Sequence, residues 1–96
     1  MGFVIKRGGR KQAFSGAKIK SSIQKSAREA GLSSSKIQEL ANEIAEPVIN
    51  LYKNKRVKST ILRKSILRRL ERRAKSAASS WRRHEKKKKK INRHLI

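Results

Sequence analysis

Apolar residues recur every three or four positions along three stretches of the chain, and this spacing constrains the fold most. Ile19 and Ile23 set the pattern in the first stretch, which predicts a helix over residues 16–30. Ser15 precedes this helix as a candidate N-cap, and Gly31 follows it as a candidate C′ residue. A helix with this pattern buries one face and leaves the opposite face in water.

The second stretch predicts a helix over residues 35–53, where Ser35 and Gln38 match a capping box. Pro47 falls inside this helix. Because proline lacks an N–H group, we expect it to kink or break the helix. Residues 54–58 are polar and basic, and are expected to form a connection to the third stretch.

Two further helices are predicted after this connection. Ser59 or Thr60 is expected to cap the third helix, and residues 74–81 carry a weaker helical pattern that predicts a fourth. Trp81 lies at helical spacing within that pattern, so it is expected in the core rather than stacked on a nucleic-acid base. The apolar face of the third helix is expected to be Leu62, Ile66, Leu67 and Leu70.

The segment ahead of the helices has a β pattern. Residues 3–5 are a short apolar run, and residues 12–14 are the expected return strand. Gly8 and Gly9 lie between them, a glycine pair that tolerates the positive φ of a hairpin turn. A lone hairpin is unstable in water, so it must pack on the helices. The predicted fold is therefore mostly α, of the α+β class: an N-terminal β-hairpin on a bundle of about four helices. The residues expected to form one core are Phe3, Phe14, Ile19, Ile23, Ile44, Val48, Leu62, Ile66 and Leu70.

Charge restricts the function of this chain. The 96 residues hold 28 Lys and Arg against 6 Asp and Glu, a net charge of +22. Residues 55–96 carry eighteen of the basic and two of the acidic side chains. Such an excess opposes compaction unless a polyanion neutralises it, which predicts nucleic-acid binding, mainly through the second half. The candidate contacts are Arg63, Lys64, Arg68, Arg69, Arg72, Arg73, Arg82, Arg83, Lys86, Lys87, Lys88, Lys89 and Lys90.

The basic C-terminal end is expected to differ from the rest of the chain. The five consecutive lysines at residues 86–90 repel one another, which predicts a disordered or frayed segment in the free protein. The chain is accordingly divided into a folded domain over residues 1–81 and a basic tail over residues 82–96.

Several function classes are excluded by composition. The chain has no cysteine, which removes disulfides, Cys-ligated zinc and thiol catalysis. No nucleophile lies in a pattern with a general base, and His84 and His94 have no neighbours at metal-ligand spacing, so we expect solvated histidines, no metal site and no enzyme. No apolar run reaches the roughly 18 residues of a membrane helix, so no membrane insertion is expected. A cytoplasmic protein is predicted, with association with the nucleoid as a variant.

Three short motifs resemble the ATP-cone domain, the nucleotide-sensing module of many ribonucleotide reductases and of the zinc-ribbon repressor of their genes. They are V-x-K-R-x-G at residues 4–9, K-I-x-x-S-I at residues 18–23 and V-x-S-x-x-L at residues 57–62, within a resemblance that covers about residues 3–81. The resemblance implies ATP or dATP as ligand, with magnesium only as the companion of the nucleotide. The nucleotide-contacting positions that it implies are Val4, Lys6, Arg7, Lys18 and Ser59.

The chemistry of these residues suits phosphate, although the motif departs from the family pattern. Arginine grips phosphate bidentately and lysine acts as a point charge. The family usually has Asp where this chain has Gly8, and an acid where it has Gln12. The leading hypothesis is a nucleic-acid-binding regulator that responds to adenine nucleotide, with DNA favoured over RNA. The alternatives are a nucleotide sensor acting on a protein partner and an architectural DNA or RNA binder whose cone is purely structural. Homo-oligomer formation is left open.

Overall fold

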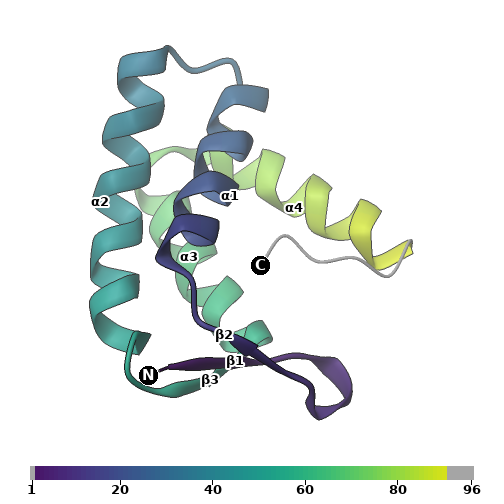
Figure 1. The fold of residues 1–96 in the computed structure, drawn as a ribbon. Coiled ribbons are helices and arrows are strands. Elements are labelled where there is room, and N and C mark those ends of the chain that lie inside the picture. Colours follow the sequence, from purple (N-terminus) through teal and green to yellow (C-terminus); the bar gives the residue numbers. More distant parts are fainter. Residues whose placement is uncertain (1, 91–96) are drawn as a thin grey trace.

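The computed structural model describes residues 2–90, with side chains described for residues 2–84. Within that part of the chain, a three-stranded sheet closes one end of a group of four helices (Figure 1). The mostly α, α+β architecture predicted from sequence is confirmed. The elements are β1 (Phe3–Ile5), β2 (Lys11–Ala13), α1 (Gly16–Glu29), α2 (Ser34–Tyr52), β3 (Arg56–Lys58), α3 (Ser59–Arg73) and α4 (Lys75–Lys90).

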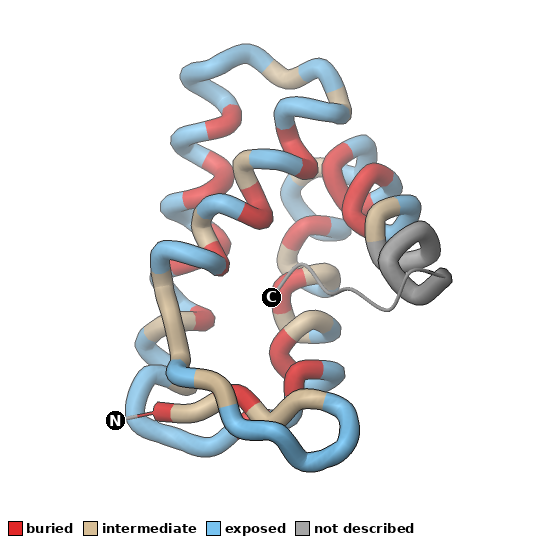
Figure 2. Tube along the Cα trace, turned by 45° about the vertical axis from the view of Figure 1, so that its right-hand side comes forward, coloured by how far each residue is buried: buried red, intermediate tan, exposed pale blue. Residues whose placement is uncertain are grey.

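The apolar stripes of the helices meet in one core, which follows the inner faces of the helices in Figure 2. Ile23, Ile66 and Trp81 are fully buried, which confirms the core role predicted for Trp81. Two predicted core members are only partly buried: Phe14 packs against the core, and Phe3 lies outside it. Phe3 departs from the prediction because its strand turns Val4, not Phe3, towards the helices.

The hairpin forms as the glycine pair predicts. Gly8 and Gly9 both have φ of 82°, a conformation that costs residues with a Cβ free energy. The Lys6 N–H group donates to the Arg10 carbonyl at 2.7 Å across the turn. The turn therefore places the two residues before Gly8, Lys6 and Arg7, at the end of the hairpin.

The prediction of a plain connection over residues 54–58 is wrong, because residues 56–58 form β3. This strand runs parallel to β1, with Val4 opposite Val57. Val57 is 5 % exposed and joins the core. A three-residue strand with a single apolar position carries no readable period, and its hydrogen-bond partner lies at the other end of the sequence.

The helix caps agree with the prediction for α1 and differ for the next two helices. Ser15 accepts a hydrogen bond from the Lys18 N–H at 3.3 Å, as predicted. Helix α2 is capped by Ser33, whose hydroxyl accepts from the Lys36 N–H at 3.3 Å, so the capping box at Ser35 is wrong. Helix α3 has Lys58 at its N-cap without a side-chain bond, because Ser59 already belongs to the helix.

Two segments that were expected to be interrupted are helical. Helix α2 does not break at Pro47, which is exposed and lies between the fully buried Ile44 and Val48. Helix α4 continues through Lys90, where a disordered or frayed block was expected. Its first half is anchored by buried residues such as Trp81, and lysine is a good helix former. The expected boundary between residues 81 and 82 therefore falls inside α4, and residues 91–96 of the tail lie outside the described residues.

Gly2 is expected to tolerate no larger side chain. A Cβ added at Gly2 would lie 2.4 Å from the Lys53 carbonyl oxygen and 2.9 Å from the Tyr52 carbonyl oxygen, both in the backbone at the end of α2. Gly2→Ala should force β1 away from α2 and lower the free energy of unfolding by about 1–3 kcal/mol, the usual cost of overpacking. Urea denaturation measures this change, and an unaltered midpoint would contradict the close approach.

Candidate nucleotide site and basic surfaces

A pocket of about 330 Å³ lies where the hairpin turn meets the start of α3. The register of the sheet builds it, because Ile5 at the end of β1 is paired with Lys58 at the end of β3. The turn then follows one strand and α3 follows the other. The pocket is lined by Ile5, Lys6, Arg7, Gly9, Lys58, Ser59 and Thr60.

The lining of this pocket suits an anion. Lys6, Arg7 and Lys58 bring positive charge, Ser59 and Thr60 bring hydroxyl groups, and none of the described residues that line it is acidic. The pocket lies at the first turn of α3, whose free N–H groups add partial positive charge. Ile5 gives the same pocket one apolar wall. The arrangement can hold a phosphate group beside an apolar moiety.

Arg63 lies one helical turn after Ser59 and is oriented back towards the start of α3. Its Nε–H donates to the Ser59 carbonyl at 3.3 Å. The sequence predicts Arg63 as a nucleic-acid contact, and this bond directs its side chain towards Ser59, which lines the pocket. Lys58 and Thr60, on either side of Ser59, were also missed as pocket residues. If β3 had been predicted from the sequence, these two residues would have been predicted as pocket residues, because the end of this strand sets the position at which α3 begins.

The structure does not bring all five predicted nucleotide contacts together. Lys6, Arg7 and Ser59 line the pocket, although Ser59 is far from the other two in sequence. Val4 is 2 % exposed and belongs to the core. Lys18 is exposed on the first turn of α1 and is not among the residues that line this pocket.

The comparison of the whole chain with a family model identifies its family. A model of the ATP cone domain matches residues 2–90, nearly the whole chain. The chain belongs to the ATP-cone family. Members of this family are regulatory modules that sense nucleotides, and ATP and dATP are their allosteric effectors. A search of curated proteins finds no match.

The α3 helix of this ATP cone carries a basic stripe. Lys64, Arg68 and Arg72 recur every four residues and are all exposed, so they lie along one face of the helix. Successive members are separated by about 6 Å along the helix axis. No ion pair of these three with any side chain in residues 2–84 is present.

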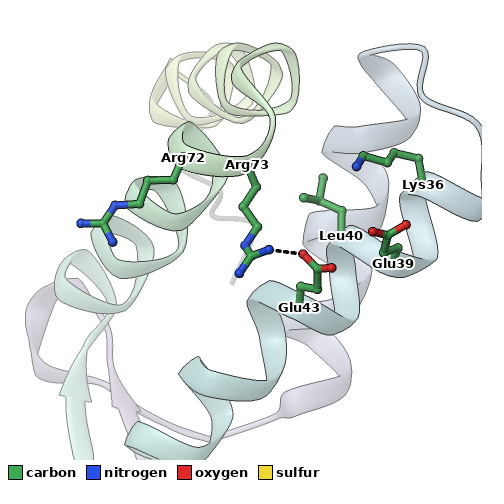
Figure 3. A pocket seen from close by; sticks show the side chains of 6 residues that line it. All are labelled: Lys36, Glu39, Leu40, Glu43, Arg72 and Arg73. Carbon is green, nitrogen blue, oxygen red and sulfur yellow. Dashed lines mark hydrogen bonds and ion pairs between the residues drawn. The ribbon is translucent and has the colours of Figure 1, made fainter.

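Other predicted nucleic-acid contacts of the ATP cone have partners within the protein. Arg73 forms an ion pair with Glu43 across a pocket of about 380 Å³ between α2 and α3, whereas Arg72 points away from that glutamate (Figure 3). Arg82 pairs with Glu71 at 2.6 Å. Both pairs are half-exposed, so they stabilise the fold little, but they reduce the charge offered to a partner. Arg69 differs again, since its Nε atom is buried without a hydrogen-bond partner among the described residues.

The prediction of a solvated His84 is wrong. Its Nε2 atom contacts the Glu29 carboxylate, and its side chain is only 15 % exposed, so the pair joins α4 to the end of α1. Sequence reasoning missed the pair because the two residues belong to helices that meet only in the fold. Among the described residues, no three His, Asp or Glu side chains gather as metal ligands. No helix in residues 2–90 combines the length and apolar character needed to cross a membrane.

Proposed function

We propose that this ATP cone binds ATP or dATP in the pocket between the hairpin turn and α3, and that the bound nucleotide regulates the binding of a partner. One observation carries the proposal. Lys6 and Arg7 come from one motif and Ser59 from another, far along the chain, yet all three line the same pocket. The family role of nucleotide sensing supports the choice of ligand.

Each residue has a distinct part in this proposal. The Arg7 guanidinium is exposed and presents the planar fork that suits two phosphate oxygens. Lys6 and Lys58 act as point charges on the same phosphate chain. The hydroxyl groups of Ser59 and Thr60 are donors at the start of α3, and Ile5 offers apolar contact. Any magnesium ion would be held by the nucleotide, because the described residues offer no carboxylate cluster.

Calorimetric titration with ATP and dATP in moderate salt tests the nucleotide site. The double variant Lys6→Ala, Arg7→Ala should weaken binding on the order of a hundred-fold, because each lost charge-assisted hydrogen bond is worth about 1.5–3 kcal/mol. A matched control, Lys25→Ala with Arg28→Ala, removes the same charges from α1 and should bind as before. Absence of saturable heat would leave the cone purely structural, and equal affinity in both double variants would assign the nucleotide to a site outside this pocket.

Nucleic-acid binding is the second candidate function, and the stripe on α3 favours it. Lys64, Arg68 and Arg72 form a row of exposed cations on one face of a helix, where each could contact a phosphate group. The tail over residues 82–96 would add further lysines to the contacts. DNA in the cytoplasm or nucleoid is the proposed partner. Duplex binding at two salt concentrations tests this candidate, and an acidic protein takes its place as partner if no nucleic acid binds.

A further inference from the structure

The sheet has one face turned away from the helices, and that face is partly apolar. Side chains alternate along a strand, so Val4, which is buried in the core, fixes the direction of its neighbours. Phe3 and Ile5 therefore point to the outer face, where both are half-buried and neither packs against the core. Figure 1 shows the sheet at the end of the molecule, with the helices on its other side.

Positive charge flanks this apolar centre on both edge strands. Residues that are paired across a sheet share a face, so Lys11 and Lys58 lie on either side of Ile5. Arg56 lies beside Phe3 in the same way. All three cations are exposed, and none forms an ion pair with a side chain in residues 2–84. The outer face of the sheet is therefore a strip of Phe3 and Ile5 with a cationic margin on each side.

The fold concentrates charge here by joining two segments without acids. Residues 2–28 contain eight Lys and Arg and no Asp or Glu, and residues 47–70 contain the same numbers. The parallel pairing of β1 with β3 places one strand of each segment side by side. The acids Glu39, Glu43 and Glu46 lie between them in sequence, on α2. No acidic residue belongs to any of the three strands.

We propose that the outer face of this sheet binds single-stranded nucleic acid. Unpaired bases stack on Phe3, while Lys11 and Arg56 on the two edge strands bind the phosphates on either side. Ile5 and Lys58 lie where this face borders the nucleotide pocket, and they are left to the nucleotide. The bases of a duplex are stacked on one another inside the double helix and cannot stack on Phe3. This face of the sheet therefore prefers single strands. The proposal rests on nucleic-acid binding, the second candidate function. It adds that the nucleic acid is single-stranded and that it binds a surface other than the lysine block.

Phe3 is the position that separates this proposal from simple charge attraction. Fluorescence anisotropy with a labelled oligothymidylate and with a duplex of mixed sequence, both without nucleotide, gives the affinities. Phe3→Leu keeps an apolar side chain but loses the aromatic ring, so single-strand binding should weaken about ten-fold while duplex binding stays unchanged. Phe3→Trp should bind the single strand at least as well as the parent, with quenching of its fluorescence. The native Trp81 is fully buried and contributes only constant background.

A pair of double variants tests the cationic margin with total charge held equal. Lys11→Gln with Arg56→Gln should weaken single-strand binding more than Lys25→Gln with Arg28→Gln, which removes one lysine and one arginine from α1. Neither Phe3, Lys11 nor Arg56 lines the nucleotide pocket, so ATP binding should survive every variant. Thermal melts confirm that each variant is folded.

The outcomes separate the two levels of the proposal. Equal single-strand affinity in the parent and Phe3→Leu proteins, without quenching in Phe3→Trp, overturns the sheet face and leaves nucleic-acid binding to α3 and the tail. If the parent protein binds neither nucleic acid at low salt, both the single-strand site on the sheet and nucleic-acid binding as a function are overturned. Displacement of the single strand by an acidic polypeptide, equally from parent and Phe3→Leu, assigns the face to an acidic protein and also overturns the proposal.

Discussion

Replacing Ile66 with Ala is expected to lower the free energy of unfolding by about 2–5 kcal/mol. Ile66 is fully buried on α3 within the core. The substitution removes apolar contacts and leaves a cavity that the surrounding helices fill only in part. A domain of this size is only marginally stabilised by burial, so the variant should be close to unfolding at ambient temperature.

The same helix supplies the control. Ile61 lies five residues before Ile66 and is 49 % exposed, so Ile61→Ala makes the same chemical change at the surface. Its cost should stay within about 0.5 kcal/mol. Urea denaturation followed by circular dichroism measures both variants. Equal losses in the two would mean that α3 is rotated from the orientation described above.

Neutralising the lysine block is expected to have the largest effect on nucleic-acid affinity. Each phosphate contact contributes about −0.9 to the slope of log affinity against log salt on duplex DNA. If residues 86–90 supply roughly four contacts, deleting residues 86–96 should make the slope less negative by roughly 3–4 units. The loss should be similar for unrelated sequences, because phosphate contacts carry no base information.

Replacing all five lysines with Gln separates charge from structure in this experiment. The backbone of residues 86–90 continues α4, so the deletion also shortens that helix, whereas the Gln variant keeps its length. If charge alone matters, the slope of log affinity against log salt should become less negative by the same amount in both variants. An unchanged slope in the Gln variant would remove the block from the interface. A duplex that competes with an acidic polypeptide identifies the preferred partner class.

The helices and the hairpin were predictable because each has a local cause. The stripe through Ile19 and Ile23 needs only its own helix to be recognised, and Gly8-Gly9 needs only its own turn. Strand β3 was not predictable in this way, because Val57 is strand only when paired with Val4. Among Ser33, Ser34 and Ser35, local chemistry does not distinguish the cap, and only the structure identifies it as Ser33.

In the candidate site too, some residues could be predicted from local motifs, and others depend on the three-dimensional fold. Lys6, Arg7 and Ser59 follow from motifs, and the fold brings them to one pocket. The pairs Arg73–Glu43, Arg82–Glu71 and His84–Glu29 each join elements that meet only in three dimensions. A count of charges along the chain therefore overestimates how many cations are available to a partner. It also misses the sheet face, which exists only because β3 returns to β1.

The parallel pairing of β1 with β3 also sets an order of folding. The β1–β2 hairpin and the four helices rest on local contacts and close quickly, whereas β1 and β3 meet only after α1 and α2 have folded back on each other. Until β3 pairs with it, β1 has one unpaired edge that could pair with the strand of another chain, and the cations of the acid-free segment over residues 2–28 disfavour that pairing.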